Sequence, residues 1–164
     1  MTTLYSGNNH YYQVINQYMS WDSAKAYAES LTYNGQQGYL ATITDSGEND
    51  FVYTLARQGL SSGDWESSSN STASFIWLGA NDNATESQWV WQTGPEAGNN
   101  FWTGYTNNGT GPGTGSGSTV NGGYANWGAD HLNDWGGSYD EDYAVMSLKS
   151  SSGNYYPAGQ WMDS

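Results

Sequence analysis

The chain has 164 residues, enough to bury the core of one domain, and only 12% of them are charged. Asp and Glu outnumber Lys and Arg by 16 to 3, so the formal net charge is -13 at pH 7. Nucleic acid and anionic membrane surfaces are therefore poor partners, because binding to them depends on Lys and Arg that neutralise phosphate charge. Divalent cations are better ones.

The aromatic content indicates a folded domain. Nine Trp, fourteen Tyr and three Phe supply apolar surface that disordered chains lack. The chain has no Cys, which excludes disulfides, thiolate metal sites and cysteine nucleophiles. No apolar run approaches the roughly 20 residues that span a bilayer, and the first residues do not resemble a signal peptide. We therefore expect no membrane insertion, and we expect the domain to be part of a larger polypeptide.

The first third of the chain predicts short strands and two helices. Aromatic and β-branched residues favour a strand at Tyr11 to Ile15. Ser20 is a suitable N-cap for a helix from Trp21 to Leu31, in which apolar residues recur at near-helical spacing. "GYLATI", Gly38 to Ile43, predicts a short strand, and a second helix is expected from Ser46 to Arg57.

The remainder predicts strands and loops. A Ser/Gly-rich connector at Ser61 to Ser74 and a long Gly/Ser/Thr-rich surface loop at Asn107 to Gly123 separate the elements. The expected strands are "FIWLGAND", "QWVWQTG", "EDYAVMSL" and "GQWMDS", with turns at Gly94-Pro95 and at Ser151 to Asn154. Two helices early and short strands late predict a single domain, residues 1–164, of the α+β class.

The stretch "NWGADHLNDWGGSYDEDYAVM", Asn126 to Met146, is the strongest functional signal. It packs five carboxylates into thirteen residues with no Lys or Arg. Without a cation these groups would repel one another and raise their own pKa values. Ca²⁺ takes about 6 to 8 oxygen ligands and accepts carboxylates, amide carbonyls and water. A calcium site is the expectation, and a solvated loop face without an ion is the alternative.

Seven segments in order resemble the C-type lectin-like domain: "WDSAKAYAESL", "GYLATITDSGENDFV", "FIWLGAND", "QWVWQTG", "NWGADHLNDWGG", "EDYAVM" and "GQWMDS". The resemblance covers Tyr11 to Asp163. With no Cys and with "TGPEAGNNFW" at Thr93 to Trp102, the chain is similar to lectin modules of large calcium-dependent bacterial RTX adhesins. The resemblance implies two helices packed on small antiparallel sheets, and a long loop region in which sugar hydroxyls complete the coordination of Ca²⁺.

The resemblance also implies the ligands. Asn133, Glu141 and Asp163 match ligands of the sugar-binding calcium, and Asp134 and Asp142 match positions that serve a neighbouring calcium in some members. The expected metal residues are Asn133, Asp134, Asp140, Glu141, Asp142 and Asp163. The expected sugar contacts are His131, Asn133, Trp135, Glu141 and Asp163.

Three departures alter the family's pattern. His131 stands where the family has Glu, Leu132 replaces Pro, and Met162 replaces Asn. Imidazole is a poor ligand for a hard cation, and a thioether is worse. The family's Pro follows a cis bond; before Leu132 that bond would cost about 2.5 to 4 kcal/mol, so we expect a trans bond or one that the metal holds cis. Oxygens are then expected from carboxylates of the same stretch: Asp130, Asp134 or Asp140.

The Trp residues divide into two expected groups. Trp127 and Trp135 flank the acidic residues, and one of them would offer an apolar wall to a sugar. Four others are expected in the core: Trp77, Trp89, Trp91 and Trp161.

Glu86 is assigned to a turn away from the site. In the family a last strand pairs with the first; whether the N-terminal segment closes the sheet differently stays open here.

Enzymatic functions fit less well. There is no Gly-X-Ser-X-Gly elbow, and carboxylates crowded on one loop suit a metal better than glycoside hydrolysis. We therefore expect a non-enzymatic, calcium-dependent carbohydrate-binding module of an extracellular bacterial cell-surface adhesin, specific for fucose or a related terminal sugar on cell-surface glycans. The alternatives are a protein-binding or ice-binding domain, and a structural spacer that calcium stiffens.

Overall fold

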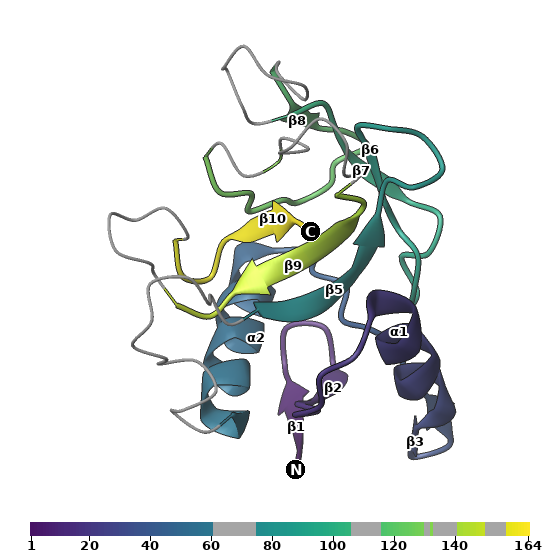
Figure 1. Ribbon diagram of the computed structural model, residues 1–164. Coiled ribbons are helices and arrows are strands. Elements are labelled where there is room, and N and C mark those ends of the chain that lie inside the picture. Colours follow the sequence, from purple (N-terminus) through teal and green to yellow (C-terminus); the bar gives the residue numbers. More distant parts are fainter. Residues whose placement is uncertain (61–74, 106–115, 130–131, 133–140, 150–156) are drawn as a thin grey trace.

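A computed structural model describes residues 1–60, 75–105, 116–129, 132, 141–149 and 157–164. Over these residues two helices accompany three antiparallel sheets, the α+β class that the sequence predicts. In Figure 1, β5 (Phe75–Asn81) and β9 (Tyr143–Ser147) cross the centre of the molecule, with both helices below them. No helix in the described part of the chain has the length and apolar character needed to cross a membrane.

The largest sheet has six strands in the order β10-β9-β5-β6-β7-β8, and the two smaller sheets are the hairpins β1-β2 and β3-β4. The helices are α1 (Trp21–Ser30) and α2 (Ser46–Gly59). The other strands are β1 (Thr2–Tyr5), β2 (His10–Gln13), β3 (Thr32–Tyr33), β4 (Gln36–Gln37), β6 (Gln88–Trp91), β7 (Asn100–Thr103), β8 (Ser118–Thr119) and β10 (Trp161–Asp163).

Both helices begin at side-chain caps. The Ser20 hydroxyl accepts a hydrogen bond from the Ser23 N–H, as the sequence predicts, at 3.3 Å. Asp45 caps α2, with its Oδ1 accepting from the Glu48 N–H at 2.9 Å. Each cap satisfies a backbone donor that has no partner within its helix.

The predicted strand at Gly38 to Ile43 is wrong. Its backbone makes single hydrogen bonds to separate partners instead of a ladder: the Gly38 N–H donates to the Leu31 carbonyl, the Ala41 carbonyl accepts from the Gly79 N–H, and the Leu40 carbonyl accepts from Thr93 Oγ1, each at 2.8 Å. Strand β8 lies within the predicted loop at Asn107 to Gly123, because residues 118–119 pair with β7. The predicted connector at 61–74 and the turn at 151–154 lie outside the described residues.

The sequence did not predict β1, β3, β4 or β7 either. β1 pairs with β2 in its own sheet, while β10 forms one edge of the six-stranded sheet. Over the described residues, the N-terminal strand therefore pairs with its neighbour in sequence and not with β10.

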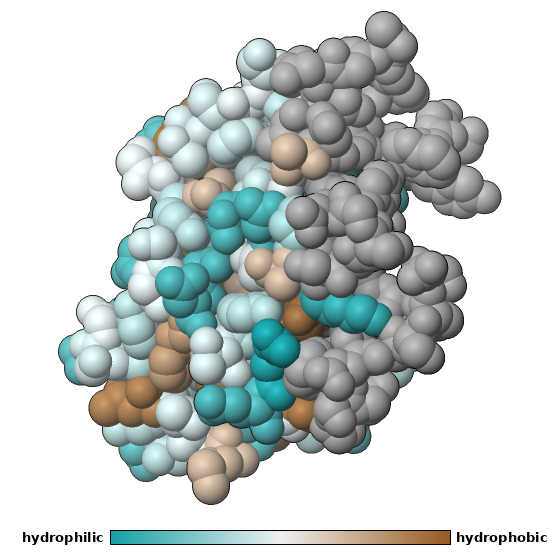
Figure 2. All heavy atoms as spheres, turned by 90° about the vertical axis from the view of Figure 1, so that its left-hand side faces the viewer, coloured by the Kyte–Doolittle hydropathy of each residue, from teal (hydrophilic) through white to brown (hydrophobic). Residues whose placement is uncertain are grey.

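Aromatic rings fill the core. Trp91 stacks on Phe101 with ring centroids 4.5 Å apart, and Trp161 meets both rings edge-on. Trp89 is buried with them, which confirms the core prediction for three of the four Trp residues. The fourth, Trp77, is half-buried and donates its indole N–H to the Met19 carbonyl at 2.9 Å. On the face drawn in Figure 2, apolar residues in the described part form small separate patches among polar ones.

Glu48 joins the N-terminal hairpin to α2. Its side chain is only 1% exposed. One carboxylate oxygen accepts from the Thr44 N–H at 2.7 Å and from the Thr44 hydroxyl at 3.0 Å. The other accepts from Asn8 Nδ2 at 2.7 Å and from the Tyr12 hydroxyl. Burial, followed by the hydrogen bond to Glu48, raises the pKa of Tyr12. Four donors therefore satisfy a buried carboxylate that has no cation in contact with it among the described side chains.

Replacing Glu48→Gln should lower the free energy of unfolding by about 2 to 3 kcal/mol, because an amide NH₂ would face donors that now bond to a carboxylate. Urea unfolding measures the change. The control is Glu29→Gln, which removes an exposed ion pair to Lys25 (2.7 Å) on α1 and should cost less than about 0.5 kcal/mol. Equal effects of the two variants would contradict this role for Glu48.

Candidate functional site

Strand β10 lies against the start of the acidic stretch. The Trp161 N–H donates to the Asn126 carbonyl, and the Gly128 N–H donates to the Trp161 carbonyl, both at 2.8 Å. The bridge between Trp127 and Trp161 is parallel. The chain therefore leaves Gly128 in the direction in which β10 runs, toward Asp163.

The end of the acidic stretch returns to the same place. β9 runs antiparallel to β10, with Ala144 opposite Asp163, and the Tyr143 N–H donates to the Ser164 carbonyl at 3.2 Å. Glu141 and Asp142 directly precede Tyr143. Both ends of the stretch thus lie along β10, the start beside Trp161 and the end beside Asp163.

Three of the six predicted metal residues, Glu141, Asp142 and Asp163, belong to the described part of the chain. In that part, no group of three or more His, Asp or Glu side chains is arranged to hold a metal. The three carboxylates by themselves are therefore not a complete calcium site. The other predictions lie outside the described residues: Asp130, His131, Asn133, Asp134, Trp135 and Asp140, with the peptide bond before Leu132.

The turn after β5 holds Asp142 in place. The sequence indicated Asp142 but did not predict this contact. The Asp82 N–H donates to the Asp142 carbonyl, and Asn83 Nδ2 donates to Asp142 Oδ2, each at 3.1 Å. Asp82 is itself only 4% exposed, and its Oδ2 accepts from the Ser87 N–H at 2.9 Å. The polar end of "FIWLGAND", where a buried strand leads into a carboxylate and an amide, is the sequence feature that could have indicated this polar turn.

Glu86 lies in a turn, as the sequence predicts, and this turn also includes Asn83, which contacts Asp142. Its Oε1 accepts from the Tyr105 hydroxyl at 3.2 Å and from the Ser87 N–H at 3.0 Å. A neutral substitution of Glu86 would therefore change a turn that contacts Asp142 through Asn83. Glu29, which is paired with Lys25 on α1, is the better control.

Negative charge is the dominant electrostatic feature near Asp142. The pKa of Tyr143 is raised, first by burial and then by the charges of Asp22 and Asp142. Its hydroxyl therefore stays neutral over the physiological range. A bound cation would offset the repulsion that these carboxylates exert on one another.

Trp127 and Leu132 anchor the acidic stretch to the core. Trp127 is 8% exposed, and its ring centroid lies 4.7 Å from that of Trp89 and 5.6 Å from that of Trp161. This packing excludes Trp127 as an apolar wall for a sugar. Leu132 is 1% exposed and belongs to the same cluster, so the residue in the place of the family's Pro is a core residue.

Met162 is turned away from Asp163. It is 4% exposed and pairs with Val145. Because side chains alternate along a strand, Met162 lies on the opposite face of β10 from Trp161 and Asp163. Its thioether packs in the interior and is not a candidate ligand.

Solved structures share this arrangement of elements. The C-type lectin CEL-I from Cucumaria echinata matches over 92% of this chain and 77% of that chain, with a TM-score of 0.57 and 19% identity. The EPNH mutant of CEL-I matches over the same shares, with a TM-score of 0.57 and 17% identity. The chain has a C-type lectin-like fold. This likeness concerns the fold alone.

In sequence, the chain is 36% identical to halomucin from Haloquadratum walsbyi over 137 residues, or 84% of this chain. Those residues span only 1% of the length of halomucin. No family model matches the chain.

Replacing Leu132→Ala should lower the free energy of unfolding by about 2 to 4 kcal/mol, since it removes buried methyl groups and leaves a cavity. Thermal or urea unfolding measures the loss, and Leu132→Met, which nearly conserves volume, should cost less than about 1.5 kcal/mol. Leu4→Ala, at an exposed position of β1, is the control and should change stability by about 0.5 kcal/mol or less. A Leu132→Ala effect as small as that of the control would contradict the anchoring role.

Proposed function

We propose that this domain is a calcium-dependent, non-enzymatic carbohydrate-binding module. The observation that carries the proposal is that both ends of the acidic stretch pair with the short strand β10, the start at Trp161 and the end at Asp163. The C-type lectin-like fold supports carbohydrate binding, and the solved structures that match it are described as lectins.

The proposed calcium ligands are oxygen donors only. Glu141, Asp142 and Asp163 adjoin the end of β10, and the residues proposed to complete the set are Asn133, Asp134 and Asp140. Carboxylates and an amide carbonyl are the hard donors that Ca²⁺ prefers. The inward packing of Met162 supports this donor set, because it removes a thioether from the site.

When bound, the ion would supply coordination positions for two hydroxyls of a sugar. The carboxylates and the Asn133 amide would accept hydrogen bonds from the same hydroxyls, so the chain's residues would orient the sugar. His131 and Trp135 are proposed as further sugar contacts. Fucose or a related terminal sugar with vicinal hydroxyls is the proposed ligand class.

The domain is proposed to act as one module of a large extracellular adhesin on a bacterial surface, of the RTX type. The match to 1% of halomucin supports a place within a much longer polypeptide. A single shallow site with millimolar affinity corresponds to only about -4 kcal/mol. Display of many sites would strengthen attachment to cell-surface glycans, since linking sites raises avidity by about 10² to 10⁴.

Excess Ca²⁺ should raise the melting temperature relative to chelator, because an ion that binds only the folded state stabilises it. Differential scanning fluorimetry measures the shift. A net charge of -13 also responds to ionic screening, so Mg²⁺ at equal ionic strength is the matched control and should give a smaller shift.

Glu141→Gln should reduce the calcium-specific part of the shift, whereas Glu29→Gln removes the same charge from α1 and should leave it unchanged. Identical melting curves in Ca²⁺ and in chelator would refute calcium binding.

The calcium-loaded domain should bind fucose more strongly than galactose, with a millimolar dissociation constant that chelator abolishes. Titration calorimetry with fucose, mannose and galactose, followed by a glycan array, tests the specificity. If no sugar binds at tens of millimolar while calcium still stabilises the fold, the metal is structural, and a protein-binding, ice-binding or spacer role replaces the lectin proposal.

A further inference from the structure

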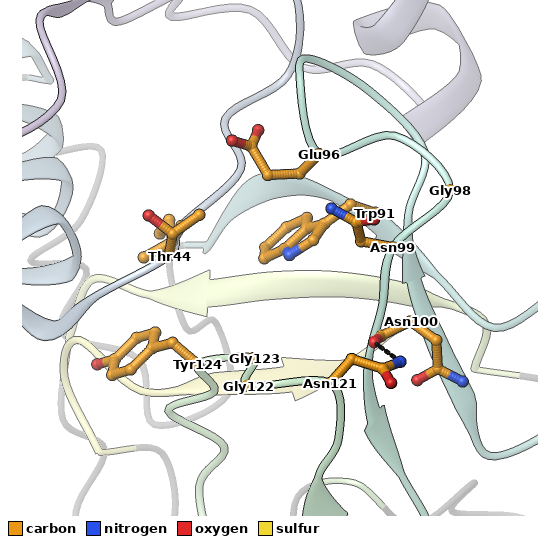
Figure 3. A pocket seen from close by; sticks show the side chains of 11 residues that line it. Thr44, Trp91, Glu96, Gly98, Asn99, Asn100, Asn121, Gly122, Gly123 and Tyr124 are labelled. Atoms are coloured by element: carbon orange, nitrogen blue, oxygen red, sulfur yellow. Dashed lines mark hydrogen bonds between the residues drawn. The ribbon is translucent and has the colours of Figure 1, made fainter.

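A cavity of about 410 Å³ opens between the segment before α2, the turn after β6 and the segment before Trp127. Its lining includes Thr44, Trp91, Glu96, Asn99, Asn121 and Tyr124 (Figure 3). The three proposed calcium ligands that the structure describes, Glu141, Asp142 and Asp163, do not line it. Ligand pockets have volumes of about 300 to 1,000 Å³, so this cavity is large enough for a small molecule.

Glu96 supplies an acceptor at the edge of the cavity. Its Oε2 accepts a hydrogen bond from the Thr42 hydroxyl at 2.6 Å, which fixes the carboxylate. Over the described residues, no donor reaches Oε1. The carboxylate can therefore accept a hydrogen bond from a ligand without breaking the one it already has.

Trp91 supplies a donor. Its ring is held by the stack on Phe101 and by the edge of Trp161, whose centroid lies 5.9 Å away. In the described part of the chain no acceptor receives the N–H of Trp91, although the residue lines the cavity. Figure 3 shows the indole between Thr44 and Asn99. The donor is thus fixed in direction and available to a ligand.

Asn121 extends the polar lining on the opposite side. Its Nδ2 donates to the Asn100 carbonyl at 3.0 Å, so the amide group is oriented and its Oδ1 is left as an acceptor. Tyr124, on the same segment, contributes an aromatic ring whose hydroxyl stays neutral, because burial, and then the charges of Asp50 and Asp45, raise its pKa. The cavity therefore combines an apolar surface with oriented donors and acceptors.

These groups select the ligand class. The lining contains no Lys, Arg or His and includes a carboxylate, which disfavours anionic ligands. One carboxylate without a second acid is a poor metal site. An ammonium group only donates hydrogen bonds, so it would leave the Trp91 N–H without an acceptor. The hydroxyls of a polyol can each donate or accept a hydrogen bond, so such a ligand can satisfy both Glu96 and Trp91.

We propose that this cavity binds a neutral polyhydroxylated ligand, such as one sugar residue of a glycan, without a metal ion. The cavity is a second binding site, independent of the calcium-dependent site proposed above. A longer glycan or a neighbouring glycan chain would occupy it.

The test is an NMR titration of the ¹⁵N-labelled domain in chelator, with methyl glucoside, methyl mannoside and methyl fucoside as probes. The indole N–H resonance of Trp91 should shift and saturate at tens of millimolar with at least one of them. Because chelator removes the calcium-dependent site, this result does not depend on the lectin proposal above. No saturable shift of that resonance with any of the three would overturn the second site.

Glu96→Gln should weaken this binding about tenfold, since a neutral oxygen is a poorer acceptor than a carboxylate, and a factor of ten corresponds to about 1.4 kcal/mol. Glu29→Gln removes the same charge on α1 and should leave the affinity unchanged. Melting temperatures of both variants check that they are folded. Methylammonium is the competing probe: saturable binding of this cation in place of the neutral sugars would also overturn the proposal.

Discussion

The placement of Trp161 in the core is the constraint on which the rest of the structure depends. Its indole N–H donates to Asn49 Oδ1 at 2.7 Å, which ties β10 to α2. Its backbone bonds to Asn126 and Gly128 bring the acidic stretch alongside β10. Asn49 in turn donates to the Gly159 carbonyl at 3.1 Å, so the chain entering β10 is fixed as well. The Trp161 ring therefore fixes the position of β10, along which the start of the acidic stretch lies.

Packing and strand pairing also position the described parts of the acidic stretch. Glu141 and Asp142 directly precede β9, whose pairing with β10 is set by the backbone, and Trp127 and Leu132 pack in the core. The polar turn at Asp82 holds Asp142 through hydrogen bonds. The two proposed sites therefore differ in chemistry: carboxylates for an ion at one, and a mixture of donors, acceptors and rings for a polyol at the other.

Local signals made the helices and most of the large sheet predictable. Ser20 and the turn before α2 act within three or four residues of themselves, and the strands at 75–82 and 141–148 carry their own β-forming residues. The strand expected at Gly38 to Ile43 failed because suitable residues do not form a ladder without a neighbouring strand in register. The role of Trp127 could not be decided from the sequence either, since a Trp beside polar residues can contact a sugar or pack in the core.

The sequence by itself determined the acidic balance, the absence of Cys, the helix caps and the segments able to form strands, because these depend on composition or on near neighbours. Only the tertiary structure decided which polar atoms meet. Asn49 and Trp161 are 112 residues apart, and Asn83 and Asp142 are 59 apart. The cavity likewise joins three separate segments. Such contacts have no local periodicity to reveal them, since they arise only when the buried rings fix how β10, α2 and the connecting turns pack together.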